Sequence, residues 1–314
     1  MTARLRFSLL GHPVRHSVSP AMCSAAFAAL DLPHIYTAID VPSEAGLARI
    51  LEDLRAGVLA GCNVTLPYKR AVFDAADERA PSAAEVGAAN VLVRTPEGRI
   101  IAHNTDAEAL AQDLAPLVEG RPRLRAAVIG GGGAAMAALI ACKKLGFTLT
   151  CMTSRSWSSS EQVLEARGAQ AVRGMGALTM PWPRADEGMP TGKLSQAMRL
   201  QWSELCAGAD LVLQATSAGM KGGDPGEDVS GVVPWARLPA HAVAYDVVYN
   251  PRETPFLRAA AARGLTAEGG LGMLVRQAAL SIALWTGLPV PAGEVFERMR
   301  RAAEEALAGG GKPR

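Results

Sequence analysis

The chain has 314 residues, of which 49% are hydrophobic and 20% are charged, and its formal net charge is +2. This composition is typical of a globular protein long enough for two domains and excludes a disordered chain. The small net charge gives no electrostatic basis for binding nucleic acid, and no apolar run reaches the roughly 18 residues that cross a bilayer. The first ten residues also lack the apolar length of a signal peptide. We therefore expect a cytoplasmic protein with no nucleic-acid or membrane partner; the sequence leaves the oligomeric state, a homodimer included, open.

Cysteine usage indicates a reducing compartment. The count of five is odd, and no two cysteines have the spacing of metal ligands. We predict free thiols and no metal site. The five are Cys23, Cys62, Cys142, Cys151 and Cys206.

Strands and helices alternate over the first part of the chain. Strands are predicted at residues 6–11, 35–39 and 59–64, and helices at residues 20–30 and 43–56. Ser19 and Ser43 are expected to cap the two helices, with Pro20 at the first helical position. This alternation predicts an α/β domain with a mainly parallel sheet.

A hairpin and a domain boundary are predicted next. Pro96-Glu97-Gly98 is typical of the turn between two strands, at residues 91–94 and 100–102. A helix at residues 106–117 then leads into Gly120-Arg121-Pro122-Arg123, a cluster typical of the boundary between domains.

Beyond this boundary the pattern is that of a dinucleotide-binding domain. A strand at residues 125–129 meets a glycine-rich turn, which continues into a helix at 134–145 and a strand at 147–153. Residues 174–201 are expected to form an irregular insertion, and the tail at 309–314 to be disordered. Later elements are predicted as strands at 209–214 and 242–247 and helices at 272–286 and 294–308.

We therefore predict an α/β protein of two domains with a cleft between them. The first, residues 1–118, is completed by the C-terminal helices at 272–308 and has a mainly parallel sheet. The second, residues 119–271, is Rossmann-like and binds the cofactor.

The glycine-rich turn fits the G-x-G-x-x-G/A fingerprint with Gly130, Gly132 and Ala135. In this fingerprint the first glycine permits the tight turn, the second lets the backbone approach a pyrophosphate, and the third small residue lets helix and strand pack closely. The N-terminus of the helix offers N–H groups to the phosphates. The flanking strand and helix favour this reading over a plain flexible turn.

The end of the following strand favours NADP over NAD. NAD-binding domains place an Asp or Glu there to accept from the ribose 2′-OH. Here the chain reads Ser154-Arg155-Ser156, and the first carboxylate is Glu161. A guanidinium and two hydroxyls suit a 2′-phosphate, which a carboxylate would have repelled.

Polar side chains from separate loops suit an anionic, hydroxylated substrate. Ser17 and Ser19 would point the same way in an extended segment and could donate a pair of hydrogen bonds to a carboxylate; the alternative is that Ser19 only caps a helix. Lys69 could donate a proton to a developing alkoxide or stabilise it as a cation. Asp106 opens a helix, where capping alone would explain it. None of the five histidines has a carboxylate or metal partner at sequence spacing, so we expect them to be structural or peripheral.

The order of these motifs resembles the shikimate dehydrogenase family from about residue 7 to about residue 290. The motifs that carry the resemblance are Ser17-Val18-Ser19-Pro20, Asn63-Val64-Thr65-Leu66-Pro67-Tyr68-Lys69, Asn104-Thr105-Asp106, the glycine-rich turn, and Ala215-Thr216-Ser217-Ala218-Gly219-Met220. The resemblance implies an NADP-dependent enzyme that reversibly reduces 3-dehydroshikimate to shikimate by hydride transfer. It also implies that Lys69 and Asp106 form the catalytic dyad that handles the hydroxyl proton.

The resemblance also implies the remaining site residues. Those that would contact the substrate are Ser17, Ser19, Asn63, Thr65, Asn90, Tyr249 and Gln277. Those that would contact the cofactor are Gly130, Gly132, Gly133, Ala134, Ser154, Arg155, Ser156, Thr216, Ser217, Gly219, Met220, Val247, Gly270 and Met273. This chain departs from the family pattern at Cys23 and Ser24, where His-Asn is usual, and at Gln214, where Asn is usual.

Three alternatives stay open at this point. A relative that acts on quinate or an aminoshikimate would need only a small change in the pocket. A non-catalytic binding or regulatory protein could keep the fold, although the intact Lys69 and Asp106 argue against it. A methylenetetrahydrofolate dehydrogenase-like enzyme would share the architecture, but the Ser-x-Ser and Asn-Thr-Asp motifs fit it poorly.

Overall fold

The computed structural model describes residues 3–157, 167–183 and 193–309. The chain divides into two compact units. Unit 1 comprises Met1–Ala109 and Leu274–Arg314, and unit 2 comprises Leu110–Met273. The chain leaves unit 1 within helix α5 (Asp106–Val118) and returns within helix α12 (Leu271–Thr286).

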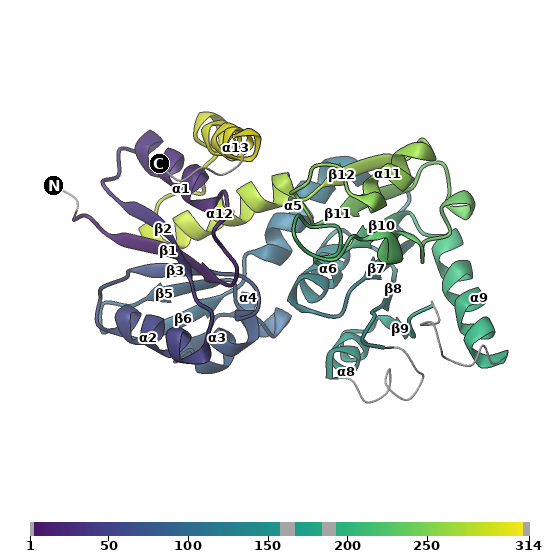
Figure 1. The fold of residues 1–314 in the computed structure, drawn as a ribbon, viewed down its shortest axis with the longest axis horizontal. Helices are drawn as coiled ribbons and strands as arrows, with labels where there is room; N and C mark the ends of the chain where they lie inside the picture. Colours follow the sequence, from purple (N-terminus) through teal and green to yellow (C-terminus); the bar gives the residue numbers. More distant parts are fainter. Residues whose placement is uncertain (1–2, 158–166, 184–192, 310–314) are drawn as a thin grey trace. The chain divides into compact units, whose positions relative to one another are not determined.

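Unit 1 contains a six-stranded sheet in the order β2-β1-β3-β5-β6-β4 (Figure 1). Its strands are β1 (Arg6–Gly11), β2 (Ile35–Asp40), β3 (Gly61–Val64), β4 (Glu78–Arg79), β5 (Val91–Arg94) and β6 (Ile100–His103). β1 runs parallel to β2 and β3, and β6 runs parallel to β4. Only β5 runs against its neighbours, so the predicted hairpin at residues 91–102 and the mainly parallel sheet are confirmed.

Helices cover both faces of this sheet. One face is covered by α2 (Glu44–Arg55), α3 (Lys69–Ala75) and α4 (Pro81–Val86), whose apolar residues share a core with the strands. α1 (Ser19–Ala29), α12 and α13 (Gly293–Ala308) lie on the other side (Figure 1). There Phe7 of β1 stacks on Trp285 of α12, with ring centroids 4.7 Å apart.

Unit 2 contains a parallel sheet in the order β12-β11-β10-β7-β8-β9. Its strands are β7 (Arg125–Ile129), β8 (Leu149–Thr153), β9 (Leu178–Met180), β10 (Leu211–Gln214), β11 (Val243–Asp246) and β12 (Thr266–Gly269). β7 lies between β8 and β10, so the chain reverses its direction across the sheet there. This is the doubly wound order, in which ligands bind at the carboxyl ends of the strands beside the reversal. The prediction of a Rossmann-like domain is confirmed.

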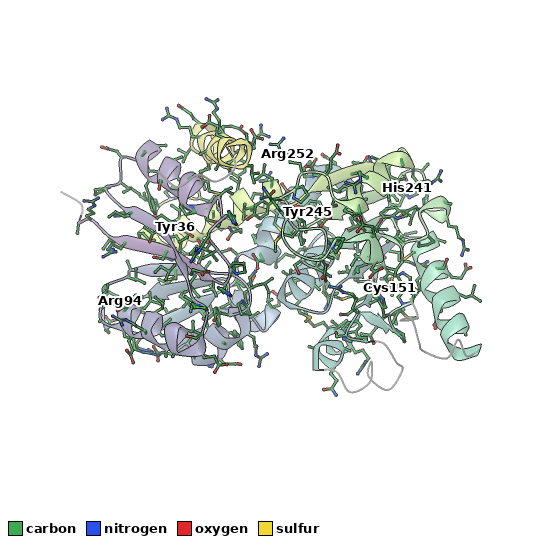
Figure 2. All side chains as sticks on the ribbon, in the orientation of Figure 1. Tyr36, Arg94, Cys151, His241, Tyr245 and Arg252 are labelled. Carbon is green, nitrogen blue, oxygen red and sulfur yellow. The ribbon has the colours of Figure 1, made fainter. Side chains whose placement is uncertain are left out.

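Helices also cover both faces of the second sheet. α9 (Lys193–Ala207), α10 (Glu227–Ser230) and α11 (Pro255–Ala262) share a core with one face. α6 (Gly133–Lys144) and α5 pack on the other. Tyr245, labelled in Figure 2, comes from this second face, and its hydroxyl donates to Asp113 Oδ2 of α5 at 2.8 Å. The remaining described helices are α8 (Arg167–Gly174) and the 3-10 turn η1 (Trp235–Arg237).

Two details of the predicted elements are wrong. Ser19 does not cap α1: it is the first helical residue, and Val18 occupies the cap position without a side-chain hydrogen bond. Part of the predicted irregular insertion is regular, because β9 and the start of α9 lie inside residues 174–201. Residues 184–192 of that insertion and 310–314 of the predicted tail lie outside the described residues. The predicted cap at Ser43 is confirmed, since its hydroxyl accepts from Gly46 N at 3.3 Å.

All five cysteines are buried free thiols, as predicted. Burial raises the pKa of Cys62, which lies in β3 beside the candidate site, above its usual range. The thiolate is the reactive form of cysteine, so Cys62 is an unreactive core residue. Within the described ranges, no helix combines the length and hydropathy needed to cross a membrane.

Candidate active site

One edge of the unit 1 sheet gathers the polar motifs. β3 and β6 end at this edge, while the antiparallel β5 begins there, because Val91 pairs with both Asn63 and His103. Asn90 precedes β5, and Asp106 follows β6 after two residues. Lys69 follows β3 as the first residue of α3. Residues far apart in sequence therefore meet at the carboxyl ends of the parallel strands.

Lys69 and Asp106 form an ion pair at this edge. Lys69 Nζ donates to Asp106 Oδ2 at 2.6 Å. The Asp106 side chain is 6% exposed and that of Lys69 is 20% exposed, so the carboxylate side chain is buried while the lysine side chain is partly exposed. An ammonium group has three N–H donors, and Asp106 takes one of them. The arrangement leaves Lys69 able to meet a ligand while Asp106 holds it in place.

Asn90 holds the carboxylate of Asp106 from the opposite side. Its Nδ2 donates to Asp106 Oδ1 at 2.8 Å and to Thr105 Oγ1 at 3.0 Å. Its Oδ1 accepts from Thr105 N at 2.8 Å. Asn104 Oδ1 accepts from Asp106 N at 3.0 Å, so Asp106 is fixed through both its main chain and its side chain. Asp106 is the first residue of α5 and not its cap.

Gln277 of α12 also contacts this network. Its Oε1 lies 3.5 Å from Asn90 Nδ2, and its Nε2 donates to Leu274 O at 2.9 Å. Its main-chain oxygen accepts from Thr105 Oγ1 at 3.1 Å. The returning helix α12 therefore contributes a predicted substrate residue to the same unit as Lys69 and Asp106.

Asn63 belongs to a second network that sequence reasoning missed in part. Its Oδ1 accepts from the Tyr36 hydroxyl at 2.8 Å, and its Nδ2 donates to Ser281 Oγ at 2.8 Å. Ser281 Oγ in turn donates to Gln277 O at 2.7 Å. Ser281 follows Gln277 by four residues on α12, so one face of that helix carries both polar groups. The four-residue spacing from Gln277 could have indicated Ser281 in the sequence. Ser281 lies in an apolar stretch, however, and belongs to no motif.

Ser17 and Ser19 lie side by side, although not in an extended segment. Val18 between them has φ −86° and ψ −4°, a helical conformation. Ser17 Oγ nevertheless donates to Ser19 Oγ at 3.1 Å and accepts from Ser19 N at 3.2 Å. A tight serine turn therefore brings the two hydroxyls together, where an extended strand was expected.

The loops after β1 and β3 are joined at the same edge. His12 N donates to Leu66 O at 2.9 Å, and Thr65 N donates to Leu10 O at 2.9 Å. This pairing sets Thr65 beside the loop that leads to Ser17. Of the predicted substrate residues, Tyr249 alone lies in unit 2, after β11.

The glycine turn of unit 2 has the geometry of the fingerprint. Gly130 has φ +140°, and a Cβ there would lie 2.7 Å from Ala215 O and 3.1 Å from Ala135 Cβ. Gly132 is exposed with an ordinary φ of −97°, and a Cβ there would meet nothing within 4 Å. No side chain caps α6, which begins at Gly133 and continues through Ala134. The turn and helix N-terminus therefore present backbone N–H groups to an open space, which fits a pyrophosphate.

Ser154, Arg155 and Ser156 follow β8 directly beside this turn. A Cβ at Gly131 would lie 3.0 Å from Ser154 Oγ, and Gly130 N donates to Thr153 O at 2.8 Å. The hydroxyls of Ser154 and Ser156 are 3.0 Å apart. Arg155 is exposed, and no carboxylate belongs to the loop itself. These donors fit a phosphorylated ribose.

The loop after β10 is shaped by Gln214, one of the departures from the family pattern. Its Oε1 accepts from Thr216 N, and its Nε2 donates to Ala218 O at 2.8 Å. The Gln214 side chain, one methylene longer than the usual Asn, therefore bridges the turn. That turn contains Thr216, Ser217, Gly219 and Met220. Gly270 approaches Val247 O so closely that a Cβ would collide with it. Val247, Gly270 and the buried Met273 thus lie near the ends of β11 and β12 in the same unit.

Asp246 is a buried carboxyl at the end of β11, directly before Val247. Burial raises the pKa of Asp246 to about 7, although the Thr254 hydroxyl (2.6 Å) and Val248 N (2.9 Å) donate to it. An exposed Asp in an unfolded chain has a pKa of about 3.9. Between about pH 4 and pH 7 the folded chain therefore keeps a proton that the unfolded chain has released.

Replacing Asp246 with asparagine is expected to remove this pH dependence. The stability that the raised pKa contributes is complete below about pH 4 and is lost as the pH rises through about 7. The unfolding free energy of the parent should therefore fall relative to Asp246→Asn by roughly 1.4 kcal/mol for each pH unit between about pH 4 and pH 7. Urea denaturation at about pH 5 and about pH 8, followed by tryptophan fluorescence, measures this. A constant difference between the two proteins would contradict the raised pKa.

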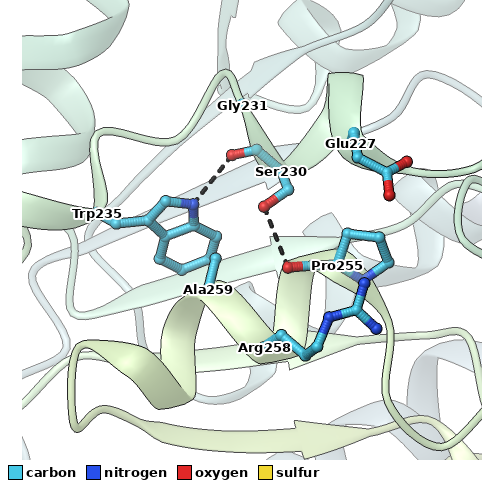
Figure 3. A pocket seen from close by; sticks show the side chains of 7 residues that line it. All are labelled: Glu227, Ser230, Gly231, Trp235, Pro255, Arg258 and Ala259. Carbon is cyan, nitrogen blue, oxygen red and sulfur yellow. Dashed lines mark hydrogen bonds between the residues drawn. The ribbon is translucent and has the colours of Figure 1, made fainter.

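Two cavities are found in the part of the chain that the structure describes. The first lies apart from the predicted site residues, and the second lies next to Asn104 and Thr105. One of about 330 Å³ in unit 2 is lined by Glu227, Ser230, Gly231, Trp235, Pro255, Arg258 and Ala259 (Figure 3). There Trp235 Nε1 donates to Ser230 O and Ser230 Oγ donates to Pro255 O, so these polar groups already serve the fold. A second of about 320 Å³ in unit 1 is lined by Asn104 and Thr105, which are engaged in the Asp106 network, by residues of α4, β6, α5 and α12, and by Val290. Neither cavity contains Lys69 or Arg155 in its lining.

Two histidines have carboxylate partners that sequence spacing did not indicate. His12 Nδ1 lies 3.1 Å from Asp40 Oδ1, and His241 Nε2 lies 2.8 Å from Asp210 Oδ1. His12 is exposed beside β2, and His241 precedes β11 at the amino end of the unit 2 sheet. Both stand outside the hydrogen-bond network of Lys69 and Asp106.

Known proteins resemble this chain over most of its length. A family model described as the shikimate dehydrogenase substrate binding domain matches residues 9–92. Another, described as the shikimate 5'-dehydrogenase C-terminal domain, matches residues 270–304. A relative from Symbiobacterium thermophilum named shikimate dehydrogenase (NADP(+)) is 38% identical over 304 residues, covering 96% of this chain and 94% of that protein.

Solved structures show the same fold. Shikimate 5-dehydrogenase from Thermus thermophilus, in complex with NADP(H) and shikimate, is 34% identical with a TM-score of 0.74, covering 96% of this chain and 99% of its own. The ligand-free 5-ketofructose reductase of Gluconobacter sp. strain CHM43 is 26% identical with a TM-score of 0.73, covering 97% of this chain and 99% of its own. The fold therefore also occurs in a protein named for another substrate.

Proposed function

Since this chain belongs to the shikimate dehydrogenase family, we propose that it interconverts 3-dehydroshikimate and shikimate with NADP as the redox cofactor. The chain is an NADP-dependent oxidoreductase of the α/β class. The observation that carries the proposed substrate and chemistry is the Lys69–Asp106 ion pair at the sheet edge, where the other polar motifs gather.

Lys69 is the proton donor in this proposal. Bound NADPH supplies the hydride that reduces the carbonyl carbon, and the carbonyl oxygen must also receive a proton to become the hydroxyl of shikimate. Lys69 Nζ donates that proton and stabilises the negative charge that develops on the oxygen. In the reverse direction the same nitrogen accepts the hydroxyl proton.

Asp106 and Asn90 orient the lysine. Asp106 Oδ2 accepts from Lys69 Nζ, and Asn90 Nδ2 occupies the other carboxylate oxygen, so the pair has one fixed geometry. Asn90 is 2% exposed, and its side-chain groups are engaged in this network, which supports an orienting role.

The serine pair supports an anionic substrate. Shikimate and 3-dehydroshikimate are carboxylates, and two adjacent hydroxyls can donate to both oxygens of a carboxylate. Ser17 Oγ and Ser19 Oγ are 3.1 Å apart at the loop after β1. Binding would exchange the hydrogen bond between the serines for two to the ligand.

Three other molecules share the chemistry that this site would recognise. Quinate, an aminoshikimate and 5-ketofructose each place a carbonyl or hydroxyl within a polar, hydroxylated molecule. The predicted cleft between the domains, the cytoplasmic location and a homodimer also stay predictions.

Initial rates at 340 nm distinguish these substrates. We expect reduction of NADP⁺ with shikimate to exceed every other pairing of NADP⁺ or NAD⁺ with shikimate or quinate. In the opposite direction, NADPH should be consumed with 3-dehydroshikimate and not with 5-ketofructose. Faster turnover of quinate or 5-ketofructose would contradict the proposed substrate, and faster turnover with NAD⁺ would contradict the role given to Arg155.

A further inference from the structure

Arg155 already has an anionic partner in the folded chain. Its Nη1 lies 2.6 Å from Asp224 Oδ2, within unit 2. The side chains are 43% and 56% exposed, so the pair is accessible to solvent and to a ligand. Asp224 belongs to the segment that follows β10, whereas Arg155 follows β8. The ion pair therefore joins two loops that together carry half of the predicted cofactor residues.

The main chain fixes Asp224 to its loop. Gly219 N donates to Asp224 O at 2.7 Å, Met220 N donates to Ser217 O at 3.1 Å, and Gly223 N donates to Met220 O at 2.9 Å. Lys221 N is bonded in turn to Asn250 O at 2.9 Å. The loop is thus closed on itself and attached to the segment after β11. The Asp224 carboxylate is presented to Arg155 from a structured loop and not from a loose one.

A 2′-phosphate and this carboxylate need the same guanidinium. Arginine recognises phosphate through two parallel N–H donors, a geometry that a carboxylate also takes. A phosphate placed on Arg155 would face the negative charge of Asp224, and like charges at close range are costly. A ribose with a free 2′-OH creates no such conflict, and its hydroxyl can donate to a carboxylate.

We propose that Asp224 competes with the 2′-phosphate of the cofactor for Arg155, and so limits the preference of this chain for NADP over NAD. The inference rests on the proposed function for the identity of the cofactor. Arg155 keeps a partner when no phosphate is bound and exchanges it when NADP binds. Asp224 is a specificity-determining residue in this account and makes no contribution to the proton transfer at Lys69.

Replacing Asp224 with asparagine is expected to tighten NADP⁺ binding by about two- to fivefold, the effect of an exposed ion pair. The dissociation constant for NAD⁺ should stay unchanged or rise. Isothermal titration calorimetry with NADP⁺ and NAD⁺ measures both. Adenosine 2′,5′-bisphosphate and adenosine 5′-monophosphate, which differ only in the 2′-phosphate, should repeat the contrast without any nicotinamide or shikimate.

The competition requires Arg155, which gives a second test. In an Arg155→Gln background, Asp224→Asn should improve NADP⁺ binding by less than it does in the parent. Equal gains in both backgrounds would mean simple repulsion and would overturn the competition. Weaker NADP⁺ binding in Asp224→Asn would also overturn it, since Asp224 would then be positioning Arg155 for the phosphate.

A matched control comes from the same unit. Glu204 pairs with Arg237 at 2.7 Å with side chains 65% and 44% exposed, so Glu204→Gln removes the same charge from a similar ion pair. It should change neither dissociation constant.

Parent protein that binds NADP⁺ but oxidises no shikimate would contradict the proposed substrate alone. Parent protein that binds NAD⁺ as tightly as NADP⁺, with Asp224→Asn unchanged, would overturn this inference together with the role of Arg155.

Discussion

Replacing Lys69 with methionine is expected to lower kcat by about 10²- to 10⁴-fold, the usual contribution of a positioned general acid or base. Methionine keeps much of the length of the side chain but has no proton to donate and no charge. The dissociation constant of shikimate should change little, because the serine pair and the Gln277 network are left intact. Stopped-flow absorbance at 340 nm and calorimetric titration of shikimate separate the two effects.

Arg70 offers the matched control for this substitution. It is the next residue of α3 and pairs with Asp74 at 2.9 Å on the exposed face of the helix. Arg70→Met therefore removes a cation from the same helix without touching Asp106, and kcat should stay at the parent level. A Lys69→Met protein that is folded and turns over near the parent rate would exclude Lys69 as the proton donor.

Replacing Gly132 with alanine is expected to weaken NADP⁺ binding by about 10- to 100-fold while leaving the melting temperature unchanged. A Cβ at Gly132 meets nothing within 4 Å, and its φ of −97° suits any residue, so the fold tolerates the methyl group. The same methyl would stand where the backbone must approach the pyrophosphate. Losing one charge-assisted hydrogen bond costs about 1.5–3 kcal/mol. Calorimetric titration and thermal unfolding measure binding and stability.

Gly130 provides the contrast to Gly132. Its φ of +140° and the 2.7 Å approach of a Cβ to Ala215 O mean that alanine there strains the backbone itself. Gly130→Ala should therefore lower the melting temperature, which Gly132→Ala should not. If Gly132→Ala bound NADP⁺ as tightly as the parent, the pyrophosphate could not lie against this turn.

The local signals in the sequence predicted most of the fold. Alternating apolar runs placed β1 and β7 at their observed residues, and Ser43 marked the start of α2 through its capping hydroxyl. α3 was not predicted, because Lys69–Ala75 lacks a capping side chain. Ser19 was misassigned as a cap because a serine before a proline usually precedes a helix. β9 was missed because it is short and ends at Met180, directly before a proline.

Sequence motifs identified several residues of the candidate site but not the contacts between them. Short motifs named Asn63, Asn90 and Asp106, but the sequence could not say that Asn90 bonds to Asp106, since the two meet only through the pairing of β3, β5 and β6. Tyr36 and Ser281 carry no motif, and each joins the site through a hydrogen bond to Asn63.

The loop after β8 illustrates the same limit for charge. The absence of an acidic residue there was read from the sequence as a preference for 2′-phosphate. Asp224 brings a carboxylate to Arg155 from a loop about 70 residues further along the chain. The composition of a loop gives the charges of its own residues, but not those of residues that are distant in sequence and contact it in the fold.

In the proposed reaction, hydrogen moves directly between the C3 carbon of shikimate and the nicotinamide of NADP. Turnover of shikimate deuterated at C3, followed by the mass of the reduced cofactor, tests this transfer. Reduced cofactor one mass unit heavier, formed at a rate that falls sharply in Lys69→Met, is the expected result. Unlabelled reduced cofactor, or none at all from folded protein that binds both ligands, would contradict the claim.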